Sequence, residues 1–124
     1  MRGAVLLAVL VGQAAGAETL SSGLSPILED ARMEMRPGDA GPEDWATFRF
    51  LAEGMTGYDQ VMDDFAVLCA EVALPALAQA GHEADVIVVA LTDRPVPRGA
   101  VDLDAVQFFE SFVTAGDGCE PLGW

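Results

Sequence analysis

The stretch VIVVAL at residues 86–91 decides the fold of this 124-residue chain. It is an unbroken apolar run rich in β-branched side chains, bounded by Asp85 on one side and Thr92 on the other. A strand without polar alternation must be buried on both faces, so the run predicts the central strand of a sheet. The rest of the chain must supply the strands and the helix that cover it.

Two upstream segments alternate apolar and polar residues. In residues 27–36, every second residue from Ala31 to Met35 is apolar and the residues between are charged, and residues 45–52 alternate in the same way. A period of two is typical of half-buried antiparallel strands. Because the connecting segment PGDAGP, residues 37–42, is rich in turn formers, the two strands are expected to form a hairpin.

Residues 56–81 carry the pattern of a long amphipathic helix. The tetrapeptide TGYD at 56–59 resembles a capping box, in which the Thr side chain and an acidic side chain satisfy the first free amides. Apolar residues then recur at spacings of three and four along one stripe: Tyr58, Val61, Met62, Phe65, Leu68, Cys69 and Val72. Asp59, Asp63, Asp64 and Glu71 lie off it. Since Pro75 lacks an amide hydrogen, the helix is expected to kink or restart there and to end near Gly81.

The segment after the central strand predicts a stiff loop and two more strands. The loop spans residues 93–99 and contains two prolines, each of which also restricts the residue before it. Residues 102–105 suit a short helical turn. The phenylalanine-rich segment that follows fits a helix or a strand, and a strand over 107–114 is favoured. A turn signal, AGDG, would return the chain through a short strand near Cys119.

These segments together predict an α+β fold. We expect a mostly antiparallel sheet of four to five strands packed on one long helix, in the order β-β-α-β-(short helix)-β-β. A chain of this length holds one hydrophobic core, so residues 27–124 are expected to form a single domain.

The first seventeen residues predict export. Arg2 supplies a positive start, an apolar run without charge follows, and Ala15-Gly16-Ala17 is the small-x-small pattern that signal peptidase cleaves. The apolar run is shorter than the ~20 residues needed to span a bilayer. We therefore expect residues 1–17 to be a signal peptide cleaved at Ala17-Glu18 and residues 18–26 to be a lead-in. The mature protein would be periplasmic or secreted, without a stable membrane span.

The charge balance excludes several classes of partner. The chain has 20 Asp and Glu residues against six arginines and no lysine, and its formal net charge is −14. Binding to nucleic acid or to an anionic membrane surface requires a basic patch, which so few arginines do not provide. The acidic surface is typical of a soluble, monomeric exported protein, and a cation-binding or basic-partner surface is the alternative.

The only two cysteines, Cys69 and Cys119, predict one structural disulfide. An even count in a chain sent to an oxidising compartment favours pairing. Closing a loop of this length would constrain the unfolded chain by about 4 kcal/mol in the loop-entropy treatment. A redox pair is the alternative, but the Cys-x-x-Cys spacing that lowers a thiol pKa is missing.

No catalytic residue, metal site or cofactor is predicted. His82 is the only histidine, and without a nucleophile beside it, it is expected to be a solvated loop residue. A single imidazole also argues against zinc. The acidic pairs Asp59 and Asp63, and Asp102 and Asp104, could hold Ca²⁺ or hydrolyse glycosides, but no calcium-loop motif is present. Favourable interaction with a helix dipole explains their placement.

Asp93, Arg94 and Arg98 are the candidate binding residues. They lie in the stiff loop just beyond the end of the central strand, which is where α/β folds place ligands. The alternative is that these arginines only pair with neighbouring acids.

Three segments, taken in order, resemble a family of uncharacterised exported alphaproteobacterial proteins defined by a domain of unknown function. They are Leu68-Cys69 with Leu74-Pro75-Ala76-Leu77, then Leu91 to Pro97, then Gln107 to Phe112 leading to Gly118-Cys119. The resemblance covers residues 27–119 and departs in the last five residues. It implies no activity.

The function expected from the sequence is therefore general. We expect a non-catalytic binding or accessory protein of the cell envelope, acting on an envelope protein or a small ligand. The alternative is a small hydrolase that uses carboxylates or a metal near the Arg94–Arg98 loop. A concave pocket lined by arginines and several acids would favour the enzyme, and a flat apolar patch would favour the partner-binding protein.

Overall fold

The structure is a computed structural model that describes residues 20–123, so the expected signal peptide and its cleavage site lie outside the described residues. Within these described residues, nine elements follow one another: β1 (Ile27–Gly38), β2 (Gly41–Leu51), α1 (Tyr58–Val61), α2 (Asp64–Leu68), η3 (Cys69–Ala73), α3 (Leu74–Gln79), β3 (Val86–Thr92), β4 (Gln107–Ala115) and β5 (Gly118–Pro121). The element η3 is a turn of π-helix.

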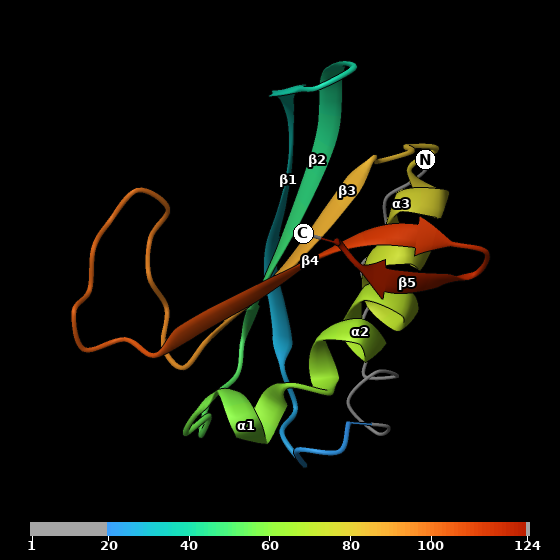
Figure 1. The fold of residues 1–124 in the computed structure, drawn as a ribbon. Coiled ribbons are helices and arrows are strands. Elements are labelled where there is room, and N and C mark those ends of the chain that lie inside the picture. Colours follow the sequence, from blue (N-terminus) through green and yellow to red (C-terminus); the bar gives the residue numbers. More distant parts are fainter. Residues whose placement is uncertain (1–19, 124) are drawn as a thin grey trace, which may run out of the picture.

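The five strands form one sheet in the order β1-β2-β3-β4-β5 (Figure 1). β1 with β2, β3 with β4, and β4 with β5 are antiparallel, whereas β2 and β3 are parallel. A parallel pair requires a crossover connection, and α1 to α3 provide it between β2 and β3. The α+β class is confirmed, in a mixed sheet, and the segment that fitted either a helix or a strand is the strand β4.

β3 is the third of the five strands and is buried along nearly its whole length, as expected from VIVVAL. Ile87, Val89 and Leu91 point into the core beneath the helices, while Val88 and Thr92 lie on the opposite face and are also buried. Both faces exclude water because helices cover one and the loop after β3 partly covers the other. The absence of polar alternation in this strand follows from that double burial.

The expectation of one long helix is wrong. α1 is a four-residue helix, and a separate helical run continues from Asp64 through α2, η3 and α3 to Gln79. Pro75 has no amide hydrogen and its ring crowds the preceding turn. Just before Pro75 the helix forms a wider π-helical turn, in which the Leu74 amide donates to the carbonyl of Cys69, five residues back. The helix is therefore continuous through Pro75 with a π-turn, and its break lies earlier, between α1 and α2.

The predicted capping box is also absent. The first residue flanking α1 is Gly57, and no side chain caps the helix there. Instead, the side chain of Gln60 reaches back, and its Oε1 accepts a hydrogen bond from the Thr56 amide at 2.8 Å. The Gln60 side chain therefore holds the backbone at the start of α1, a role expected of the Thr56 and Asp59 side chains.

The short helix expected at residues 102–105 is a hydrogen-bonded turn. The Ala105 amide donates to the carbonyl of Asp102 at 3.1 Å, and the Asp102 side chain accepts from the Asp104 amide at 2.9 Å. Asp side chains that bond the backbone two residues on compete with helix formation, which explains why the turn does not propagate.

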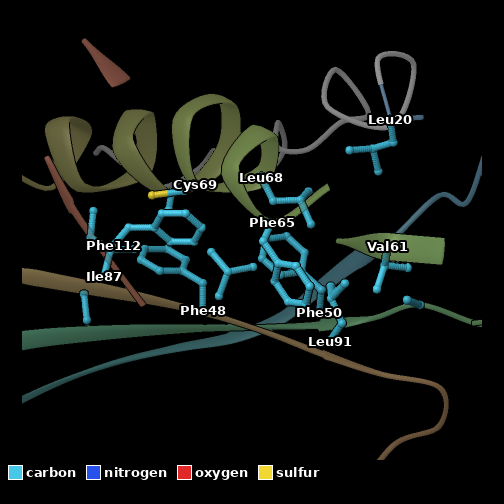
Figure 2. Packing of buried hydrophobic residues seen from close by; sticks show 14 of the residues in the cluster. Leu20, Phe48, Phe50, Val61, Phe65, Leu68, Cys69, Ile87, Leu91 and Phe112 are labelled. Atoms are coloured by element: carbon cyan, nitrogen blue, oxygen red, sulfur yellow. The ribbon is translucent and has the colours of Figure 1, made fainter. Parts of the chain in front are cut away.

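The core lies between the helices and one face of the sheet. Figure 2 shows Phe50 of β2 beside Phe65 of α2, and Phe48 of β2 below Cys69, on the side where Phe112 and Ile87 lie. Burying large aromatic rings provides most of the apolar area that a small domain can remove from water. The helices contact β3, β4 and β5. Leu28 of the edge strand β1 packs against the core, whereas Met33 and Met35 further along β1 are exposed.

The predicted disulfide is confirmed. Cys69 in η3 is bonded to Cys119 in β5, with their Cα atoms 6.2 Å apart. Cys69 is fully buried beside Phe112 of β4 (Figure 2). The bond therefore ties the short terminal strand to the helical layer.

A buried carboxylate, Asp64, anchors the segment before β1. Asp64 was placed off the apolar stripe, yet it is fully buried. Its carboxylate accepts hydrogen bonds from the hydroxyl and the amide of Ser22, and the Ser22 hydroxyl accepts from the Leu24 amide. Because a buried charge requires partners, the residues that lead into β1 form part of the domain.

Candidate functional site

The face of the sheet that the helices leave open carries a groove of about 430 Å³. The long connection between β3 and β4, drawn in orange in Figure 1, extends away from the helices and forms one wall. Side chains of β1 to β4 and of this connection line the groove: Arg36, Trp45, Thr47, Arg49, Val88, Ala90, Leu91, Thr92, Val96, Pro97, Arg98, Gly99, Ala100, Gln107, Phe108, Phe109 and Ser111. The floor is mainly apolar, whereas three arginines provide positive charge.

The first of these arginines, Arg36, lies over an aromatic ring. Its guanidinium carbon is 4.3 Å from the centre of the Trp45 ring, a cation–π contact. Its Nε donates to Glu34 at 2.6 Å, and this hydrogen bond lowers the pKa of the Glu34 carboxyl. The Trp45 indole N–H donates to Glu43 at 3.1 Å. These contacts fix the indole and the guanidinium as one flat wall of the groove.

The other two arginines, Arg49 and Arg98, share a single carboxylate. Arg98 donates from Nη2 to Oδ1 of Asp30 at 2.6 Å, and Nη1 of Arg49 lies 3.8 Å from Oδ2 of the same residue. Arg49 also donates to the carbonyl oxygen of Val96, which attaches the loop to the sheet. One negative charge faces two positive charges, so this end of the groove retains an excess of positive charge.

The predicted binding residues are therefore separated. Arg98 lines the groove, whereas Asp93 and Arg94 are absent from its lining. Asp93 closes the base of the loop, since its amide donates to the Val106 carbonyl at 3.0 Å and its Oδ1 accepts from the Val106 amide at 2.9 Å. Arg94 donates to both carboxylate oxygens of Asp93. These contacts lower the pKa of Asp93, with Arg94 as the largest cause, and raise the pKa of Arg94.

The expectation that His82 is merely solvated is wrong. Its side chain is only one-third exposed, and its Nε2 lies 2.8 Å from Oδ2 of Asp44, on β2. The Asp44 amide donates to the side chain of Asp85 at 2.8 Å, and the Asp85 amide donates to the Asp44 carbonyl. These contacts join the start of β3 to β2, so His82 belongs to the junction that sets the parallel pair.

Within residues 20–123, no group of three or more His, Cys, Asp or Glu side chains lies close enough to hold a metal ion. In the same part of the chain, no helix combines the length and apolarity needed to cross a membrane. Asp59 lies in α1 and Asp63 follows it at the break before α2, and neither lines the groove.

Sequence reasoning missed Arg36, Trp45 and Arg49 as site residues. The alternation of β1 and β2 did place them on the polar face of the hairpin, and that face lines the groove. The alternation could not predict that β2 pairs with β3 or where the loop after β3 lies. These two features bring the polar face of the hairpin opposite Arg98.

Comparison with known proteins identifies a family. No curated protein and no solved structure is significantly similar to this chain. A family model does match residues 5–123, nearly the whole sequence, and it carries the description family of unknown function (DUF6497). The chain therefore belongs to this family.

Proposed function

We propose that this protein is an exported, non-catalytic binding protein of the cell envelope, and that its groove takes an anionic ligand with a flat or apolar body. The ligand's anionic group would lie near Arg49 and Arg98, and its apolar part would lie over the floor provided by Val88 and Ala90. Trp45 and Phe109 would flank that apolar part.

The observation that carries this proposal is the sharing of Asp30 by Arg49 and Arg98 in a chain of net charge −14. Three of the six arginines line one groove, and the described residues that line it include no Asp or Glu. Guanidinium groups bind carboxylate, sulfonate and phosphate oxygens through parallel N–H donors. In a protein that is acidic elsewhere, this groove is therefore the place that attracts an anion.

The shape of the groove supports binding of a small molecule. Its volume of about 430 Å³ lies within the range usual for ligand clefts, and it combines apolar walls with a few polar groups. The alternative of a carboxylate hydrolase requires a carboxyl able to gain and lose a proton in the groove. Arg98 holds Asp30, Arg36 holds Glu34 and lowers its pKa, and the Trp45 indole donates to Glu43. The arrangement therefore favours binding.

Arg98 is the residue through which to test the groove, because Arg94 is a matched control in the same loop. Each pairs with one aspartate and is partly exposed, but only Arg98 lines the groove. The probe is anilinonaphthalene sulfonate, an anion on an aromatic body. We expect Arg98→Ala to weaken its Kd about tenfold, as the loss of one charge-assisted contact implies. Arg94→Ala should leave the Kd unchanged.

Phenylnaphthylamine, the same aromatic body without the sulfonate, separates the charge from the apolar contact. Arg98→Ala should leave binding of this neutral probe unchanged in a fluorescence titration, whereas Phe109→Ala should weaken both probes. Equal weakening of the anionic probe by the Arg94 and Arg98 substitutions would show that the groove does not provide the anion site.

Export is a separate part of the proposal. The signal-peptide pattern supports it, and a disulfide is compatible with an oxidising compartment. Mass spectrometry of the protein purified from its native host should find Glu18 as the first residue. An intact Met1 in a membrane fraction would contradict cleavage. The residues that line the groove belong to a single copy of the chain, so ligand binding in the groove would not require a second copy.

A further inference from the structure

β1 is an edge strand whose outer side has no partner among residues 20–123. It is long, from Ile27 to Gly38, and it pairs only with β2. Leu28 near its start packs against the core, but Met33 is 39% and Met35 63% exposed. Long edge strands are templates for pairing with another strand, and native proteins usually shorten or block them.

In the central part of β1, the amide and carbonyl of every second residue point away from β2. Pro37 lies opposite Pro42, and because neither has an amide hydrogen, this is a non-hydrogen-bonded pair. Hydrogen-bonded and non-hydrogen-bonded pairs alternate in an antiparallel ladder. The amides and carbonyls of Met35, Met33 and Ala31 must then point away from β2. The contacts of Asp44, which lies opposite Met35, agree with this assignment. Its amide and carbonyl bond to Asp85 on the far side of β2, so they do not bond to Met35.

We propose that β1 binds β1 of a second copy of this chain in antiparallel register, with Met33 opposite Met33, to form a continuous ten-stranded sheet. The charges along β1 favour this register. Four charged residues alternate along one face of β1: Asp30, Arg32, Glu34 and Arg36. In this register, Asp30 lies opposite Arg36 of the second copy and Arg32 lies opposite Glu34 of the second copy. The two-fold axis repeats both pairs, so every charge faces its opposite.

Neighbouring registers are disfavoured by the same charges. Moving the second copy by two residues in one direction places Glu34 opposite Glu34 and Arg32 opposite Arg36. Moving it by two residues in the other direction places Arg32 opposite Arg32 and Asp30 opposite Glu34. Like charges directly opposite each other destabilise a strand pair, whereas opposite charges stabilise it. A shift of one residue would bring inward-pointing backbone groups against outward-pointing ones.

The other face of β1 supplies apolar contacts in the same register. Met33 meets its own copy, and Ala31 lies opposite Met35 of the second copy. This strip would cover the methionines that the helical layer leaves exposed. Such an interface is isologous, since the same patch serves both copies. The two grooves would then lie on the same side of the joined sheet, and the proposal does not depend on what they bind.

The register is tested by single cysteines at Met33 and Met35, in the otherwise unchanged chain. The native cysteines are disulfide-bonded, so each variant has one free thiol. In the proposed register the two Cα atoms of residue 33 lie about 5.5 Å apart, whereas those of residue 35 are separated by about 13 Å along the strands. We expect a short bis-maleimide crosslinker to convert Met33→Cys into a covalent dimer and to leave Met35→Cys monomeric. Equal crosslinking of both variants, or of neither, would overturn the register.

Charge reversal tests the interface without a crosslinker. Sedimentation of the unmodified chain at low ionic strength should give twice the chain mass. Arg32→Glu should give a monomer, because the substituted carboxylate would lie opposite Glu34 of the second copy, twice in each dimer. Adding Glu34→Arg restores opposite charges and should restore the dimer. Arg94→Glu, with the same change in net charge away from β1, should remain dimeric. A monomeric unmodified chain, or a double variant that stays monomeric while circular dichroism shows it folded, would overturn the proposal.

Discussion

Replacing Cys69 and Cys119 together by alanine is expected to lower the free energy of unfolding by about 2–5 kcal/mol, as removal of a native disulfide does in small secreted domains. The bond closes a loop of 50 residues in sequence separation, so it limits the unfolded chain substantially. It is also the covalent link between β5 and the helical layer. Without the disulfide, β5 would be held in place by its pairing with β4 and by few packing contacts.

Urea unfolding with and without a reductant measures this effect. Reduction should lower the midpoint of the unmodified chain and leave that of the double-alanine variant unchanged. Hydrogen exchange should accelerate first in β5, because β5 is a four-residue edge strand. An unfolding midpoint that does not respond to reduction would contradict a stabilising role of the bond.

Phe48→Ala is expected to destabilise the domain by about 3–5 kcal/mol, the usual cost of emptying a buried aromatic site. Phe48 is 1% exposed and lies between β2 and the helical layer (Figure 2). Small domains have a total stability of about 5–15 kcal/mol, so this single change would remove a large share of it. The variant should unfold at a much lower urea concentration, measured by circular dichroism.

Phe109 is the matched control for this substitution. It is the same residue type in the same sheet, but it is 70% exposed and lies on the groove face. Phe109→Ala should change stability by less than about 0.5 kcal/mol, as surface substitutions do. Phe109→Ala should also weaken binding of the aromatic probes, because Phe109 lines the groove. Phe48 does not line it, so Phe48→Ala removes no contact with the probes. Similar destabilisation by both substitutions would show that the open face is packed like the core.

Much of the fold could be predicted from local patterns. The alternation in β1 and β2, the unbroken run in β3 and the turn before β5 each marked an element that the structure contains. The disulfide followed from the cysteine count and the expected compartment, both of which are properties of the chain alone. These predictions succeed because side-chain period and turn chemistry act over a few residues.

The helical region shows where local patterns fail. The apolar stripe continued from Tyr58 through Val72 without indicating a break, yet the chain breaks between α1 and α2. Tyr58 packs against Phe108 of β4, with ring centres 5.7 Å apart, and its hydroxyl donates to Glu110, which raises the pKa of Tyr58. Asp64 is buried because Ser22 reaches it from outside the helix. Both outcomes depend on partners more than forty residues away in sequence.

The candidate site divides in the same way. The sequence by itself determined the polar face of β1 and β2, the stiff loop after β3, the acidic background and the position of Arg98. Only the tertiary structure decided that β3 lies parallel to β2, that Arg94 turns to Asp93, and that Arg36, Arg49 and Arg98 line one groove. The physical reason is that strand order and loop placement are chosen by the burial of the whole core and by long-range hydrogen bonds, whereas side-chain alternation specifies only the face on which each residue lies.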